Sequence, residues 1–285
     1  MRAIFMIIFA FMLFSCLDTL AKFAGQSVPA LEAAWARFVG HAILAILVFQ
    51  PWRNRSIMKT NQPFNQALRG LFLMGSTIFN FLALRHLQLA ETMSIMFAGP
   101  FVVTALAGPV LGEWAGRRRW GAIIVGFLGV LIVTRPGIAV IDPAVLYSIA
   151  AMLCYAGYAL MTRKMSPAET ARSLIFYSAL LPAIIMTPIA VSVWVAPPNW
   201  MVYAELAGMG VFGFVGHWFL IKANQLADVP TLAPFLYTQI VWMVGLGYVA
   251  FNEIPGIWTM LGSAVIVSSG LYLLYRERVV NKHAE

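Results

Sequence analysis

Ten apolar segments, each about twenty residues long, fill most of this 285-residue chain. A helix needs roughly 20 mostly apolar residues to cross the hydrocarbon core of a bilayer. The segments are continuous, whereas the strands of a membrane β-barrel alternate over about ten residues. We therefore predict an all-α membrane protein with ten transmembrane helices. The predicted helices span residues 4–25, 31–50, 67–86, 89–111, 118–135, 143–162, 172–194, 203–222, 229–251 and 256–275.

The composition excludes an ordinary soluble domain. Hydrophobic residues make up 61% of the chain and charged residues 11%, against about half and a quarter in soluble proteins. The formal charge of +8 lies in short clusters between the apolar segments. This placement argues against a nucleic-acid partner and makes the lipid bilayer the expected environment.

The Lys and Arg residues indicate how the chain is oriented. With ten spans, 15 of the 19 basic residues fall on the side that holds both termini. Cytoplasmic loops carry an excess of Lys and Arg. We therefore expect both termini in the cytoplasm of a bacterium, with the protein in the inner membrane. The first segment resembles a lipoprotein signal at its end, but we expect it to be a retained helix.

The two halves of the chain match at an offset near 140 residues. Cys16 matches Cys154 at an offset of 138, and Glu113 matches Glu253 at 140. Further matches are Pro29 with Pro167, Phe38 with Phe176, Leu89-Ala90-Glu91 with Leu226-Ala227-Asp228, Gly121 with Gly262 and Gly129 with Gly270. The pattern predicts a duplication, with a first repeat at 1–137 and a second at 138–285.

Each predicted repeat holds five spans, which is an odd number. The second repeat must therefore enter the membrane from the opposite side. Inverted repeats of this kind are typical of secondary transporters, where their exchange of conformation gives alternating access. The sequence thus predicts a carrier built from two inverted five-helix repeats.

Short glycine-rich motifs carry a family resemblance. They are Gly70 to Gly75, Leu89-Ala90-Glu91, Gly112-Glu113 and Gly121 to Gly129, echoed by Leu226-Ala227-Asp228, Glu253, Gly262 and Gly270. In these the chain resembles the drug/metabolite transporter superfamily, in its ten-helix bacterial branch with two EamA-type domains. Asn252-Glu253 departs from the Gly-Glu usual in the second half of that family.

The resemblance implies a cavity between the halves, surrounded by helices 1, 3, 4, 6, 8 and 9. It also implies a substrate among amino acids, nucleosides, vitamins, S-adenosylmethionine and amphipathic drugs. Its motifs identify the family well and the substrate poorly.

Ionisable residues inside membrane segments are costly and often functional. Asp18 and Lys22 share one face of the first segment, and Arg37 lies six residues into the second. All three can meet in the outer half of the membrane, as a gating or coupling site or as a structural ion pair. His41, on the face of Arg37, is a further gating candidate, with packing as the alternative. Glu113 and Glu253 are expected to be structural.

Polar and aromatic residues near mid-membrane are candidates for substrate binding, because ligand pockets combine aromatic walls with a few placed polar groups. Asn80 and His217 are repeat partners at an offset of 137, and His217 precedes Trp218. The ninth segment contributes the polar stretch Tyr237, Thr238 and Gln239. The remaining candidates are Tyr155, Tyr158 and Phe101, for which helix packing is the alternative role.

Catalytic chemistry is not expected. The sequence has no Gly-x-Ser-x-Gly, His-Glu-x-x-His or P-loop motif and no His or Cys cluster with metal-ligand spacing. We therefore expect no catalytic residue, metal or cofactor and no ATP drive. An intramembrane enzyme built on Asp18 and Arg37 is the weakest alternative.

The sequence favours transport of a flat or amphipathic small molecule such as riboflavin. An efflux carrier for an amino acid or another metabolite is the alternative, and a non-transporting receptor or assembly subunit is the alternative of another class. A strongly anionic substrate would need more buried Lys or Arg. Transport direction, coupling to protons and the oligomeric state, a homodimer included, stay open.

Overall fold

A computed structural model describes residues 2–112, 114, 116–135, 142–165, 167–226 and 232–282. Helices make up its regular structure, and these residues contain no β-strand. The helices are α1 (Arg2–Ala24), α2 (Ala30–Phe49), η1 (Arg55–Met58), α3 (Pro63–Leu84), α4 (Leu89–Met96), α5 (Gly99–Leu111), α6 (Arg117–Thr134), α7 (Ala144–Met165), α8 (Ala171–Ser192), α9 (Trp200–Leu226), η2 (Ala233–Thr238), α11 (Gln239–Phe251) and α12 (Ile257–Lys282).

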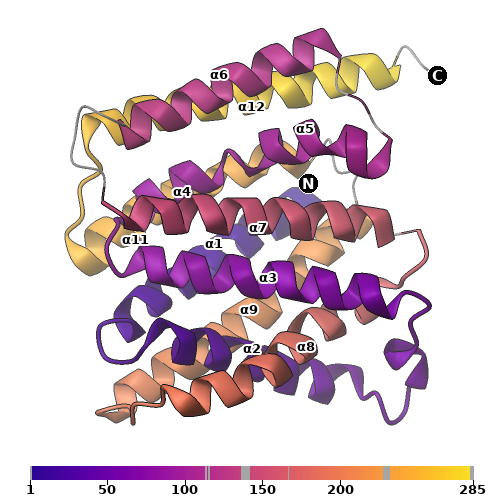
Figure 1. Ribbon diagram of the computed structural model, residues 1–285, viewed down its shortest axis with the longest axis vertical. Helices are drawn as coiled ribbons and strands as arrows, with labels where there is room; N and C mark the ends of the chain where they lie inside the picture. The colour runs from indigo at the N-terminus through magenta and orange to yellow at the C-terminus, as the bar shows by residue number, and fades with distance from the viewer. Residues whose placement is uncertain are drawn as a thin grey trace.

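The long helices run back and forth across one bundle (Figure 1). At one edge α6 packs on α12, and at the opposite edge α2 packs on α8. Between these edges lie the packed pairs α1 with α9, α3 with α7, and α4 with α11. The start of α1 and the end of α12 lie at the same end of the bundle (Figure 1).

Among the described residues, seven helical segments are long and apolar enough to cross a membrane: α1, α2, α3, α4 with α5, α7, α8 and α9. Shorter apolar helices lie at Phe235–Phe251 and Ile257–Tyr272. The 18-residue helix α6 begins with three arginines. The all-helical membrane fold is therefore confirmed, while the number of ten spans stays a prediction.

Large apolar side chains cover the outside of the bundle. Ile124, Phe127, Ile184, Val191 and Val249 are each at least 58% exposed. Water would make such a surface costly, whereas lipid chains solvate it. The exposed surface therefore fits a protein embedded in a bilayer.

Two of the segments that pass the centre of the bundle are interrupted. Between α4 and α5 the helix breaks at Phe97 and Ala98, directly before Gly99 and Pro100. Proline lacks the amide proton that a continuous helix needs and disfavours helical geometry in the residue before it. At the corresponding place in the second half, the 3₁₀ helix η2 precedes α11 and has a proline in its first turn. Irregular backbone therefore lies near mid-length between α4 and α5, and directly before α11 in the other segment.

Gly129 and Gly262 allow the close contact between α6 and α12. A Cβ on Gly129 would lie 2.6 Å from Ile266 Cγ1, and a Cβ on Gly262 would lie 2.7 Å from the carbonyl oxygen of Gly129. Small residues that let two backbones approach are a common basis of helix packing in membranes. The repeat glycines noted in the sequence thus have a packing role here.

The departure Asn252-Glu253 has a conformational explanation. Asn252 ends α11 in the left-handed conformation, with φ of 55°. Gly112 ends α5 in the same conformation, with φ of 77°. Glycine is favoured in this region, and asparagine is among the few other residues that tolerate it. Asn252 therefore replaces glycine without changing the turn. Glu113, Asp228 and the predicted boundary between the repeats lie outside the described residues.

Candidate functional site

A cavity of about 200 Å³ lies at the centre of the bundle. Its walls come from α1, α2, α3, α4, α5, α7, α9, η2 and α11, so both halves of the chain contribute. Of the residues predicted from the sequence, seven line it: Asp18, Arg37, Asn80, Tyr155, Tyr158, His217 and Gln239.

One wall of the cavity carries a polar group of four side chains. The amide nitrogen of Asn80 donates a hydrogen bond to Asp18 Oδ1 at 3.0 Å. A guanidinium nitrogen of Arg37 donates to the hydroxyl of Thr77 at 2.7 Å. Because Thr77 and Asn80 are three residues apart on α3, that helix presents both to the charges on α1 and α2.

The two histidines lie one behind the other. His217 on α9 lines the cavity, and its ring centre is 5.0 Å from that of Phe14 and 5.5 Å from that of His41. His41 is buried behind it against Phe214 and does not line the cavity. His217 therefore borders the cavity, and His41 contacts His217 from the side away from the cavity.

The rest of the wall is aromatic and sulfur-rich. Tyr155 and Tyr158 on α7 lie with ring centres 6.2 Å apart. Met93, Met96 and Met243 line the same space. Aromatic rings and polarisable sulfur atoms suit a flat or cationic ligand.

Four predicted binding residues lie away from the cavity. Trp218 stacks on Phe49 at 5.7 Å, on the side of α9 that faces α2. Phe101 packs at Gly126 of α6. Tyr237 packs against Phe97 and Gly270, and Thr238 donates to the carbonyl of Phe235. In this conformation their contacts are those of helix packing.

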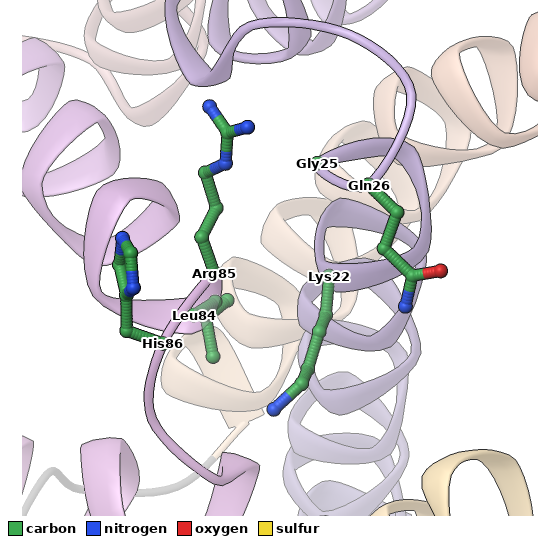
Figure 2. A pocket seen from close by; sticks show the side chains of 6 residues that line it. All are labelled: Lys22, Gly25, Gln26, Leu84, Arg85 and His86. Atoms are coloured by element: carbon green, nitrogen blue, oxygen red, sulfur yellow. The ribbon is translucent and has the colours of Figure 1, made fainter.

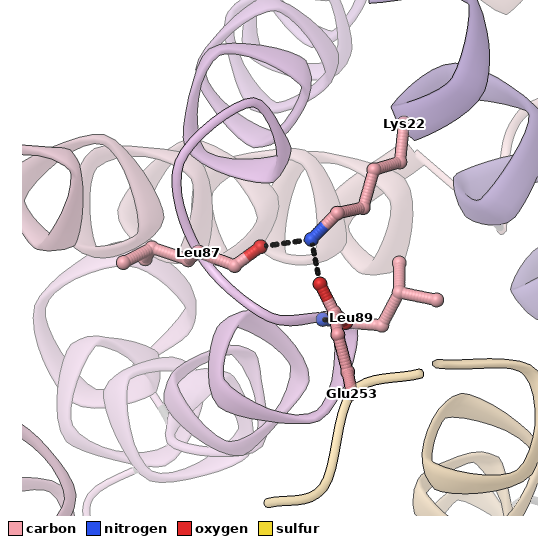
Figure 3. Close-up of polar contacts among 4 residues, drawn as sticks. All are labelled: Lys22, Leu87, Leu89 and Glu253. Atoms are coloured by element: carbon pink, nitrogen blue, oxygen red, sulfur yellow. Dashed lines mark hydrogen bonds and ion pairs between the residues drawn. The ribbon is translucent and has the colours of Figure 1, made fainter. Parts of the chain in front are cut away.

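Lys22 has a different partner from the one expected. Its ammonium group is ion-paired with the Glu253 carboxylate and donates to the Leu87 carbonyl at 2.6 Å (Figure 3). The other Glu253 oxygen accepts from the Leu89 amide at 3.1 Å. Asp18 is bonded to Asn80 instead, so the Asp18–Lys22 ion pair is not formed. Glu253 and Lys22 are 231 positions apart in the sequence, so helical spacing could not have predicted their pairing.

We call this group the Lys22 cluster; it consists of Lys22, Leu87, Leu89 and Glu253. It connects α1, the α3–α4 connection and the end of α11. Beside it, the rings of Phe23 and Phe251 lie 4.4 Å apart. These contacts close one end of the bundle, between segments of both halves.

A second hollow, of about 310 Å³, lies at that end. Figure 2 shows its lining from two elements, with Lys22 and Gln26 at the end of α1, and Leu84, Arg85 and His86 at the end of α3. Leu84 also lines the central cavity. This second hollow therefore shares Leu84 with the central cavity, while Lys22 lines the hollow and Leu89 lines the cavity.

Several lining residues escaped the sequence analysis although their spacing shows them. On α3 they are Leu73, Ser76, Thr77, Phe81 and Leu84, and on α4 to α5 they are Leu89, Thr92, Met93, Met96, Phe97 and Pro100. Both sets follow the 3-4-3-4 spacing of a single helix face. The polar residues Ser76 and Thr77 share this α3 face with Asn80, so they could have been predicted from the sequence as cavity residues.

A membrane-embedded helical bundle around a polar and aromatic cavity is the architecture of a multi-pass transporter. The chain belongs to the EamA-like transporter family, which it matches over residues 1–135 and 142–276. The family resemblance predicted from the motifs is thereby confirmed. The family and the relatives below are transporters and not enzymes, in agreement with the sequence.

Three curated relatives span nearly the whole chain. It is 30% identical over 265 residues to the S-adenosylmethionine uptake transporter of Rickettsia prowazekii, covering 92% of this chain and 88% of the relative. It is 26% identical to the riboflavin transporter of Vibrio cholerae, covering 91% and 88%. It is 25% identical to the pseudopaline exporter of Pseudomonas aeruginosa, covering 89% of each.

A solved crystal structure shares the fold. Its TM-score is 0.64 at 19% identity, covering 97% of this chain and 98% of the other. The likeness therefore extends over the entire helical bundle.

Proposed function

We propose that the chain is a secondary carrier that moves a small organic metabolite across the bacterial inner membrane by alternating access. The observation that carries the proposal is the central cavity, which both halves line and which the Lys22 cluster closes off at one end. A carrier needs such a mid-membrane site with a barrier on at least one side.

In this proposal the chain has ten spans in two inverted repeats, 1–137 and 138–285, with both termini cytoplasmic. Helix packing supports it. If α1 corresponds to α7 and α3 to α9, the packed pair α1–α9 corresponds to the pair α7–α3, and both pairs are present. The symmetric pairs α2–α8, α4–α11 and α6–α12 are also present.

Gating is assigned to the end that holds the Lys22 cluster. Breaking the Lys22–Glu253 ion pair would release α1 from the end of α11 and give access to the cavity from the second hollow. The interrupted segments α4–α5 and η2–α11 supply backbone that can bend, since discontinuous helices are common at transporter sites.

The substrate-contacting residues of the proposal are Asn80, Tyr155, Tyr158, His217 and Gln239. At about 200 Å³ the cavity is below the roughly 300–1,000 Å³ of typical ligand sites, so we expect it to widen when a substrate binds. The names of the relatives make S-adenosylmethionine and riboflavin the first solutes to test. Both import and export occur among these relatives.

The test is uptake and efflux in proteoliposomes that contain the purified chain. The solutes are labelled S-adenosylmethionine, riboflavin and aromatic amino acids, each with and without a pH gradient. We expect saturable movement of one solute class in the parent and at least about a tenfold lower rate in His217→Ala and Asn80→Ala, from the loss of cavity contacts.

Trp218→Ala is the matched control, because Trp218 adjoins His217 in sequence but packs on Phe49 outside the cavity. It should retain transport if it folds as the parent does. Movement that survives in His217→Ala and Asn80→Ala would refute the site. No movement of any solute by folded protein would contradict the carrier and favour a receptor.

A further inference from the structure

Two opposite charges line the central cavity without forming an ion pair with each other. Asp18 comes from α1 and Arg37 from α2, and both line the space. In the described part of the chain no ion pair joins Asp18 to Arg37, whereas Lys22 is paired with Glu253. The cavity is therefore lined by a negative and a positive group that are not ion-paired with each other.

Arg37 has unused hydrogen-bonding capacity. One terminal nitrogen donates to Thr77, and the guanidinium carbon lies 4.7 Å from the ring centre of Phe38. Its Nε is buried and has no acceptor, and the whole residue is only 7% exposed. A buried guanidinium N–H without an acceptor is costly, so a ligand oxygen that reaches the Arg37 guanidinium when the cavity widens gains binding energy.

Asp18 is held on one side only. Its Oδ1 accepts from Asn80, and in the described part of the chain no hydrogen bond reaches its other oxygen. Asn80 thus holds the carboxylate in place and leaves acceptor capacity toward the cavity. A ligand ammonium group is a charge-assisted donor that can use this capacity.

We propose that Asp18 and Arg37 form a dipolar recognition site for the zwitterionic end of an amino-acid-like substrate. Asp18 accepts hydrogen bonds from the α-ammonium group, and Arg37 donates to the α-carboxylate. The inference rests on the proposed carrier function and names its substrate class. Tyr155, Tyr158 and the three methionines then surround the remainder of the substrate.

The balance of charges selects a zwitterion over the alternatives. A purely anionic solute would satisfy Arg37 but would place like charge near Asp18. A neutral flat solute such as a flavin would leave both desolvated charges without an oppositely charged partner. A substrate with both groups neutralises both charges at once, and a site built around such groups discriminates strongly against analogues that lack them.

The experiment combines substrate analogues that lack one charged group with protein variants that lack the matching charged side chain. Competition is measured in proteoliposomes between S-adenosylmethionine and two analogues, the decarboxylated compound and the 2-oxo compound that lacks the amine. The parent should prefer the intact compound over each analogue by about tenfold or more, as expected for hydrogen bonds to charged groups. Riboflavin is included as the neutral flat solute.

In Arg37→Gln the preference over the decarboxylated analogue should fall toward one, while the preference over the 2-oxo analogue persists. In Asp18→Asn the preference over the 2-oxo analogue should fall toward one, while the preference over the decarboxylated analogue persists. A preference ratio is measured within one protein sample, so a lower yield of folded variant does not change it. Arg37→Lys, which keeps the charge, should retain part of the preference, and Arg172→Gln, which removes an exposed arginine, should behave as the parent.

The outcomes separate this inference from the carrier function. A parent that transports riboflavin but no zwitterion overturns the recognition site and keeps the carrier. A parent that transports the intact compound without discriminating against either analogue also overturns the recognition site and keeps the carrier. A parent that moves no solute overturns both.

Discussion

At the scale of single residues, the cavity depends on contacts between charged groups and small polar side chains. Arg37 and Asp18 are each held by one α3 residue, Thr77 and Asn80. Ionisable groups in a membrane are stable only when such partners replace water. The α3 face thus positions the charges as well as lining the site.

Thr77→Val tests this positioning with little change in volume. Removing the hydroxyl deprives the Arg37 guanidinium of its described acceptor, so we expect the free energy of unfolding to fall by about 1–3 kcal/mol. The measurement is an SDS unfolding titration in mixed micelles. Thr104→Val is the control, because Thr104 donates to Pro100 of its own helix segment. Equal stability of the two variants would show that Thr77 does not hold Arg37.

At the scale of elements, the bundle depends on helices that approach closely and on helices that are interrupted. Gly129 and Gly262 bring α6 and α12 together at one edge. The breaks between α4 and α5 and before α11 lie instead at the central cavity. Rigid packing is therefore found at the edge and irregular backbone at the site, the distribution that a moving carrier needs.

Gly129→Ala should weaken the α6–α12 pair. The added Cβ would overlap Ile266 and the Gly262 backbone, so we expect a loss of about 1–3 kcal/mol and a lower melting temperature of the detergent-purified protein. Gly121→Ala on the same helix is the control, since a Cβ there meets nothing within 4 Å. That variant should match the parent or gain slightly, because alanine favours a helix over glycine. Equal losses of stability in Gly129→Ala and Gly121→Ala would mean that backbone conformation, and not helix packing, causes the destabilisation.

At the scale of the whole molecule, the Lys22 cluster joins segments from the two halves at one end of the cavity. Its ion pair connects residues 231 positions apart, and its hydrogen bonds reach Leu87 and Leu89 where the α3–α4 connection enters α4. A conformation held by such contacts should open when one of them is removed.

Glu253→Gln should shift the protein toward a state open at this end. We expect a cysteine placed at Thr92, after Cys16 and Cys154 are changed to serine, to react about tenfold faster with an impermeant maleimide supplied from that side. The reason is that loss of a charge-assisted bond shifts the equilibrium by that order. Arg85→Gln, which removes a neighbouring exposed charge outside the Lys22 cluster, should leave the labelling rate unchanged. Equal rates in Glu253→Gln and the parent would exclude a gating role for this ion pair.

The sequence by itself determined the class of fold, because long apolar segments leave a chain few alternatives to membrane helices. Its short glycine-rich motifs also indicated the family, which the match over residues 1–135 and 142–276 confirms. Seven of its thirteen site residues line the cavity, since a polar residue in an apolar segment must face the bundle interior.

Only the tertiary structure decided which polar groups meet. It paired Lys22 with Glu253 and not with Asp18, and it separated His217 from Trp218, which faces α2. It likewise assigned Tyr237 and Phe101 to helix packing. Helical spacing sets which residues share a face, but the rotation of each helix, and so the face that meets the cavity, follows from packing between segments far apart in the chain.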